Sequence, residues 1–175
     1  KFNRDLLPNI YESGSVVRPT DYDNDGDMDL FIGSRMIPWN YPESASSYML
    51  ENINGKFYLY EDINKSFNDL GLVTDATWAD YDNDGDSDLF VVGEWMPLTL
   101  IKNDSGLFKK NKLNNNCDDT YGWWYSIESG DFNNDGQQDL VMGNLGENYK
   151  YKASKDEPFE MFYDCLLYTS DAADD

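Results

Sequence analysis

The chain has 175 residues, about the length of one domain, and its charge is strongly unbalanced. It carries 34 acidic and 13 basic residues, for a formal net charge of −21. Such a surface repels phosphate backbones and anionic lipids, so we expect neither nucleic acids nor membrane surfaces as partners. Aromatic residues make up 15% of the chain, which is enough for a hydrophobic core and argues against a disordered acidic segment.

The scarce residue types exclude several kinds of site. The sequence has no histidine, which excludes Ser-His-Asp and Cys-His nucleophilic sites and histidine-ligated zinc or haem. With two cysteines, we expect no disulfide framework. No run approaches about 20 apolar residues, so we expect no insertion into a membrane. The chain starts at Lys1 without a signal peptide, and we expect the natural N-terminus to be missing.

Three copies of an acidic motif organise the chain, at residues 21–30, 80–89 and 131–140. The first copy reads Asp-Tyr-Asp-Asn-Asp-Gly-Asp-Met-Asp-Leu, and the copies start 59 and then 51 residues apart. Carboxylates this close repel one another unless a cation binds them. Calcium is the usual hard cation that takes oxygen ligands. The motif therefore predicts three calcium loops, one in each of three repeats.

Short apolar segments flank each acidic loop in the same order. A strand-like segment precedes each loop, at residues 15–18, 76–79 and 124–127. A run of mainly apolar residues that ends in glycine follows each loop, at residues 30–33, 89–93 and 140–143. The second run has one residue more than the first, for which a bulge is one interpretation.

A hairpin follows in the first two repeats, at residues 48–59 and 98–108. Asn54-Gly55 marks the turn of the first hairpin. Asn52 and Asn103 are 51 residues apart and occupy matching places in the two repeats. Each repeat therefore predicts four strands, with the acidic loop between the first and the second. No long amphipathic helical pattern competes, and the predicted fold class is all-β.

We divide the chain into a repeat domain at residues 1–164 and a tail at residues 165–175. The repeats span roughly residues 12–62, 70–110 and 120–164, and the last strands of the third are expected near 149–152 and 159–163. The tail matches nothing upstream and resembles translated sequencing-adapter read-through. We therefore exclude it from the fold, with a divergent natural tail as the alternative.

The spacing of oxygen ligands in the acidic loops differs from that of an EF-hand. Positions 1, 3, 5 and the glycine at position 6 agree with that motif. Position 12, however, offers Ile32, Val91 and Met142, none of which can bind a metal. The last carboxylate lies at position 9 instead, so the chain is expected to leave the ion directly into a strand.

We assign the side chains at positions 1, 3, 5 and 9 as the metal ligands: Asp21, Asp23, Asp25, Asp29, Asp80, Asp82, Asp84, Asp88, Asp131, Asn133, Asp135 and Asp139. Backbone carbonyls are expected to ligate at position 7, which holds Asp27, Asp86 and Gln137. Aspartate, asparagine and glycine are also ordinary turn formers, so a turn without a metal is the alternative for any single copy. Because the loop recurs in every repeat, we expect the three ions to be structural rather than catalytic.

These motifs resemble the FG-GAP/VCBS repeat family of calcium-binding β-propellers, as in "DYDNDGDMDLFIG", "WADYDNDGDSDLFVVGEWMP" and "GDFNNDGQQDLVMGNLG". The resemblance favours the bacterial secreted and cartilage-acidic-protein-like members over integrin α-subunit heads, because no Gly-Ala-Pro follows the strand. It implies four-stranded blades, calcium between the first and second strands, and a secreted, periplasmic or cell-surface location. Closed propellers typically have 4–8 blades, and this chain supplies about three. We therefore expect it to be a fragment that packs against further blades of the full-length protein.

The expected function is non-enzymatic: an extracellular repeat domain, stabilised by calcium, that binds a protein or a glycan. Trp39, Trp95, Trp123 and Trp124 are candidate platforms for sugar rings, with Trp39 and Trp95 the best exposed and core packing favoured for Trp124. The alternative is the propeller of a secreted lyase or glycosidase whose active site lies in missing or loop regions. Carboxylate pairs do not decide between them, because 34 acidic residues supply many.

The charge of the ligands predicts that the third loop binds calcium most weakly, because Asn133 replaces a carboxylate there. Calcium titration of variants in which Asp21, Asp80 or Asp131 is replaced checks this order. A third loop that binds most tightly would contradict it.

Overall fold

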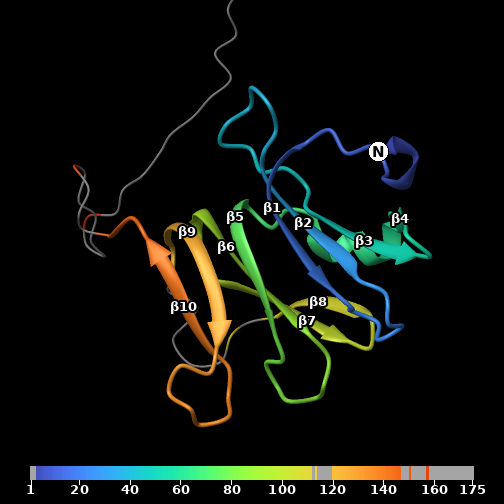
Figure 1. The fold of residues 1–175 in the computed structure, drawn as a ribbon. Helices are drawn as coiled ribbons and strands as arrows, with labels where there is room; N and C mark the ends of the chain where they lie inside the picture. Colours follow the sequence, from blue (N-terminus) through green and yellow to red (C-terminus); the bar gives the residue numbers. More distant parts are fainter. Residues whose placement is uncertain (1–2, 112, 114–119, 147–149, 151–156, 158–175) are drawn as a thin grey trace, which may run out of the picture.

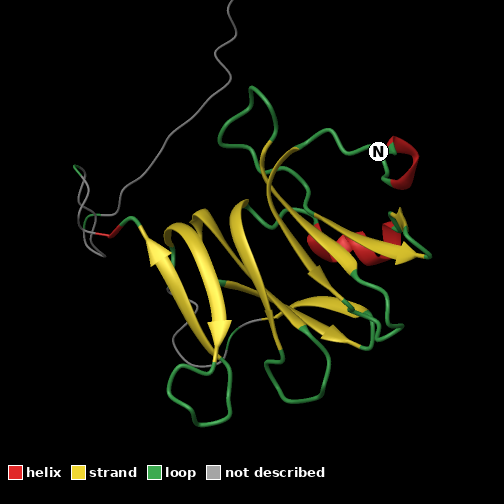
Figure 2. Ribbon diagram, viewed as in Figure 1, coloured by secondary structure: helices red, strands yellow, loops and turns green. Residues whose placement is uncertain are grey.

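The computed structural model describes residues 3–111, 113, 120–146, 150 and 157. Strands dominate it, with two 3-10 turns and one short α-helix (Figures 1 and 2). In chain order the elements are η1 (Arg4–Leu6), β1 (Ser13–Thr20), β2 (Asp29–Met36), β3 (Tyr48–Ile53), β4 (Lys56–Tyr58), α1 (Glu61–Asn64), η2 (Lys65–Phe67), β5 (Leu72–Ala79), β6 (Asp88–Met96), β7 (Thr99–Asp104), β8 (Leu107–Asn111), β9 (Gly122–Gly130) and β10 (Asp139–Asn144). No helix in the described part of the chain is long and apolar enough to cross a membrane.

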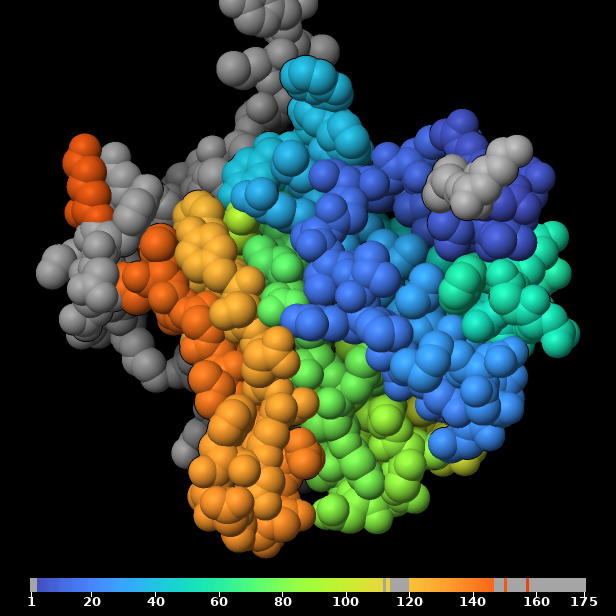
Figure 3. All heavy atoms as spheres, viewed as in Figure 1, coloured from blue at the N-terminus to red at the C-terminus, as the bar shows by residue number. Residues whose placement is uncertain are grey.

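The strands form antiparallel sheets that follow the repeats. Strands β1, β2, β3 and β4 pair in sequence order as one four-stranded sheet. Strands β5, β6, β7 and β8 pair in the same way, and β9 pairs with β10. The start of β9 also pairs with the end of β6, with Glu94 opposite Trp123 and Met96 opposite Gly122, so the second and third repeats share one sheet. The sheets do not close into a ring in the described part of the chain. The residues of the three repeats lie side by side as successive sectors (Figure 3). The all-β class and the propeller-fragment architecture are confirmed.

The first strand of each repeat carries one bulged residue opposite the second strand. Ser15 is bulged in β1, Thr74 in β5 and Tyr125 in β9. The extra residue of the second apolar run is therefore not itself a bulge. Val92 pairs with Asp75, and the irregularity falls on Thr74 across the ladder.

Two hydrophobic clusters fill the spaces between neighbouring sheets. The first joins the first and second repeats and includes Phe31, Phe67 and Phe108, with Trp78 packed against it. The rings of Phe31 and Trp78 meet edge to face with centroids 6.4 Å apart. The second cluster joins the second and third repeats through Phe90 and Ile127. Each sheet is therefore stabilised by burying its face against the next one.

Polar side chains also join the first strands of neighbouring repeats. The Ser15 hydroxyl donates to the carbonyl of Val73 at 2.6 Å, and that of Thr74 donates to the carbonyl of Trp124 at 2.8 Å. Asp75, which is buried, pairs with Arg18 of the first repeat at 2.7 Å and accepts the Ile127 amide of the third at 3.0 Å. One carboxylate thus joins three repeats.

The connection from the first to the second repeat contains helical turns that the sequence patterns did not indicate. Helix α1 and turn η2 follow β4, and the Asn64 side chain bonds both backbone groups of Met49 on β3. Phe67 at the end of η2 is fully buried in the first cluster. Four residues of helix are too few to give a periodic pattern.

The outer face of the third repeat is open in the described structure. Val141 occupies the place in β10 that Phe31 and Phe90 occupy in β2 and β6. Phe31 and Phe90 are buried by the following sheet, whereas Val141 is 57% exposed. The strands expected after residue 146 and the tail at residues 165–175 lie outside the described residues, apart from single positions.

This asymmetry predicts unequal costs for truncating equivalent side chains. Phe31→Ala should destabilise the protein by about 3–5 kcal/mol, because it leaves a cavity between two sheets. Val141→Ala should cost less than about 1 kcal/mol, because little contact is lost at an exposed site. Urea unfolding of both variants in calcium measures the difference. Similar losses at the two positions would show that Val141 is covered in solution.

Candidate metal centres in the acidic loops

The three acidic loops occupy the same place in successive repeats. Each joins the first strand of its repeat to the second, between β1 and β2, β5 and β6, and β9 and β10. They follow one another along one edge of the sheets (Figure 1). Placement after a strand and directly before another fixes both ends of each loop to the sheet.

The three loops share one backbone conformation. The asparagine at position 4 has a positive φ each time, at 60° for Asn24, 60° for Asn83 and 61° for Asn134. The glycine at position 6 has φ of 92°, 93° and 86° in the three copies. Residues with a Cβ rarely adopt this left-handed region, and asparagine is the commonest exception. The Asn-x-Gly spacing of the motif is therefore a requirement of the turn.

The first aspartate of each loop holds the turn closed. Its two oxygens accept the amides of positions 5 and 6, as when Asp21 accepts from Asp25 and Gly26, both at 3.0 Å. Asp80 and Asp131 repeat this pattern at 2.8–3.2 Å. The position 5 carboxylate accepts the amide of position 7 in all three loops. These bonds hold all three loops in the same turn and keep the position 1 and position 5 carboxylates against the backbone amides of the loop.

The position 9 aspartates are the most buried members of the first two loops. Asp29 is 1% exposed and Asp88 is fully buried. Asp29 accepts the Tyr22 amide at 3.3 Å and the Asn52 amide at 2.7 Å. Asp88 accepts the Tyr81 amide at 2.8 Å and the Asn103 amide at 2.7 Å. One side chain therefore links the loop, the second strand and the hairpin.

Burial changes the protonation of these carboxyl groups. Desolvation raises the pKa of Asp29 to about 6, against the opposing effect of its two amide donors. Desolvation also raises the pKa of Asp88. A carboxylate in such a place is costly unless a positive charge lies beside it. Both positions therefore favour either a proton or a bound cation.

Oxygen atoms converge in the first two loops at the distances that a metal ion requires. Ligand atoms of Asp21, Asp23 and Asp29 all lie within 4.8 Å of one another. Asp80, Asp82 and Asp88 form the same arrangement in the second loop. The sets contain carboxylate oxygen alone, which suits a hard divalent cation such as calcium. The two acidic triads could each hold a metal ion, and the residues present fit calcium.

The third loop has the same turn but a different set of charges. Asn133 replaces the aspartate of position 3, and its side-chain amide donates to the Asp135 carboxylate at 3.0 Å. Asp139 accepts the Phe132 amide at 3.1 Å and is only half-buried. No third acidic triad is found among the described residues. The prediction that Asp131, Asn133, Asp135 and Asp139 bind an ion stays a prediction.

The position 7 side chains reach the hairpin turn of their own repeat rather than the triad. Asp27 accepts the Asn54 amide at 3.4 Å, and Asp86 accepts the Ser105 amide at 2.7 Å. Asp86 also accepts from the Asn24 side chain of the first loop at 3.1 Å, so the two loops are in direct contact. Ligation by the backbone carbonyls of Asp27, Asp86 and Gln137 stays a prediction.

Asn52 and Asn103 belong to the site, although the sequence patterns gave them only a place in the hairpins. The backbone amide of each donates to the buried position 9 carboxylate of its repeat. The side-chain oxygen of each also accepts the backbone amide of the glycine in its hairpin turn, Gly55 or Gly106, both at 2.8 Å. Their in-phase spacing was the signal that could have identified them.

A family model described as "FG-GAP-like repeat" matches the chain twice, at residues 21–91 and 80–142. Together the two matches cover residues 21–142, which is more than half of the chain. The first match contains the loops of the first two repeats, and the second contains those of the second and third. A search of curated proteins found no match.

The raised pKa of Asp29 predicts that the metal-free protein loses stability as the pH rises from about 4 to about 6. In this range the folded state keeps a proton that the unfolded state, with a pKa near 4, has released. Two pKa units correspond to at most about 3 kcal/mol. Urea unfolding of the parent and Asp29→Asn in a chelator, at several pH values, isolates the effect.

In that experiment the difference in unfolding free energy between the two proteins should decline with pH. The exposed Glu61→Gln variant serves as the control and should run parallel to the parent. A parent that gains stability relative to Asp29→Asn across the same range would contradict the prediction.

Proposed function

The chain belongs to the FG-GAP-like repeat family, and from this we propose that it is an extracellular scaffold, stabilised by calcium, that binds a protein or glycan. The pair of acidic triads, built alike in successive repeats, carries the proposal. FG-GAP repeats are typically extracellular, and extracellular calcium modules bind in roughly the 10⁻⁴–10⁻³ M range. A site of that strength fills outside the cell and stays empty in the cytosol.

The ions of this proposal have a structural role. Each would lie between the first and second strands of a repeat, beside a carboxylate that also holds the hairpin. Each would offset the repulsion among its aspartates and the desolvation of position 9. The same arrangement in two repeats argues against a single catalytic centre. We therefore propose a binding protein rather than an enzyme.

The edge opposite the acidic loops offers the better surface for a ligand. The segment after β2, residues 37–47, extends there, away from the loops (Figure 1). The Tyr41 hydroxyl anchors this segment to the second repeat by donating to the buried Glu94 carboxylate at 3.0 Å and accepting from the Trp95 indole at 2.9 Å. Arg35 also pairs with Glu94, at 2.5 Å.

Aromatic side chains gather at this edge. Trp39 is fully exposed on a residue with φ of 72°, and Trp95 packs on Trp123 with ring centroids 5.1 Å apart. Trp95 is half-buried rather than well exposed, and Trp124 packs against the second core cluster. An exposed indole on an anchored segment can stack on a sugar ring or fill a pocket of a protein partner.

Calcium should raise the melting temperature of the chain. At a concentration tenfold above Kd each ion stabilises the folded state by about 1.4 kcal/mol, so two ions correspond to roughly 5–10 °C in a protein of this size. Replacing both Asp21 and Asp80 by alanine should abolish most of the shift. Differential scanning calorimetry with calcium, magnesium and chelator measures it. An identical melting temperature in calcium and chelator would refute a calcium-stabilised scaffold.

Trp39→Ala should weaken ligand binding at least tenfold without changing the melting temperature, because the indole buries no surface in the free protein. A glycan array and a panel of extracellular matrix proteins, probed in calcium, identify the ligand class. Tyr11→Ala removes an aromatic ring that is 83% exposed elsewhere and serves as the matched control. Equal binding by the parent and Trp39→Ala would exclude this surface.

A further inference from the structure

The ammonium group of Lys102 lies among the carboxylates of the second acidic loop. Its Nζ is 2.5 Å from Oδ2 of Asp82 and 3.3 Å from Oδ2 of Asp84. Its side chain is 27% exposed, so it is held against the protein surface. Positions 3 and 5 of the second loop therefore already contact one positive charge.

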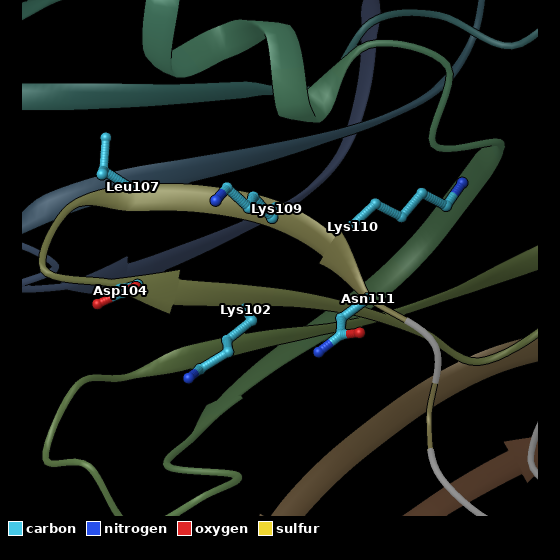
Figure 4. A pocket seen from close by; sticks show the side chains of 6 residues that line it. All are labelled: Lys102, Asp104, Leu107, Lys109, Lys110 and Asn111. Carbon is cyan, nitrogen blue, oxygen red and sulfur yellow. The ribbon is translucent and has the colours of Figure 1, made fainter.

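The hairpin that carries Lys102 explains why this side chain turns to the loop. Lys102 on β7 is the direct cross-strand partner of Lys109 on β8, and Lys110 is the next residue on β8 (Figure 4). Like charges placed directly opposite one another in a sheet repel. Lys109 is exposed to solvent. Lys102 lowers the repulsion by reaching for Asp82 and Asp84.

The equivalent residue in the first repeat has the opposite charge. Asn52 and Asn103 make the same bond to position 9, so the residues before them, Glu51 and Lys102, occupy the same place. Glu51 accepts the Tyr22 hydroxyl at 3.1 Å and pairs across the hairpin with Tyr58. Two loops with aspartate at the same five positions therefore stand beside side chains of opposite sign.

We propose that Lys102 is a tethered cation of the second site, which offsets part of the negative charge of the loop without calcium and is displaced when calcium binds. This inference rests on the proposed calcium binding. Calcium must displace the Lys102 ammonium or bind beside it, and in either case the positive charge weakens the affinity of the site for a divalent cation. The same charge stabilises the metal-free loop. Lys102 thus sets the second site to fill at a higher calcium concentration than the first.

Calcium titration calorimetry on site-isolated chains tests the proposal. In the background Asp21→Ala and Asp131→Ala, only the second loop keeps all its ligands, and Lys102→Met should tighten its calcium affinity about tenfold. Methionine keeps the length and apolar stem of the side chain while removing the charge. Without calcium the same variant should melt at a lower temperature than its background. A mere packing defect would weaken both properties, so the opposite signs are diagnostic.

Two further variants complete the test. In the background Asp80→Ala and Asp131→Ala, Glu51→Lys should weaken the first site about tenfold. Lys109→Met removes a neighbouring lysine that contacts no loop carboxylate in the described structure and should change the second site less than twofold. An unchanged or weaker second site in Lys102→Met overturns the proposal while leaving calcium binding intact. No calcium uptake in either background overturns the proposed function as well.

Discussion

A buried carboxylate at the start of the second strand is the constraint on which each of the first two repeats depends. Asp29 and Asp88 accept one amide from their loop and one from their hairpin, in a place without solvent. Without this carboxylate, the loop, the second strand and the hairpin would lose the hydrogen-bond acceptor that links them. Its burial also leaves a charge that the amides alone do not balance, since the pKa of Asp29 rises in spite of them. Under the proposed function, calcium supplies the balance, and folding and ion binding become one process.

The local features of the fold were predictable because short-range chemistry determines them. Asn24 and Gly26 must take up left-handed backbone, and the apolar runs after each loop must be strands if the loop opens directly into a sheet. Asn54-Gly55 likewise predicts the turn between β3 and β4. These patterns repeat in phase, so the strands and loops assigned in one repeat support the same assignment in the others. The family assignment follows from the same residues.

Features that depend on contacts between distant segments were not predictable. Nothing near Lys102 in the sequence indicates that its ammonium reaches Asp82, because the residues meet through hairpin geometry. The extra residue Val92 is not a bulge, because it stays paired, and the bulge lies on the first strand at Thr74, in the place that Ser15 and Tyr125 take in the other repeats. The indole of Trp95 is half-buried because residues 37–47 reach across from another repeat. These features are decided by tertiary packing between distant segments, which the local sequence pattern does not predict.

The bulges in the first strands have a consequence for how the repeats can be arranged. Ser15 and Thr74 are small hydroxyl residues, and each uses its bulge to reach a carbonyl of the following repeat. Tyr125 occupies the third bulge with a large ring that is 52% exposed. A phenol cannot make the short bond that a hydroxyl on Cβ makes. The first two repeats are therefore joined to the next one by a short hydroxyl bond that the third repeat cannot make, and the residue at the bulge distinguishes the third repeat from the other two.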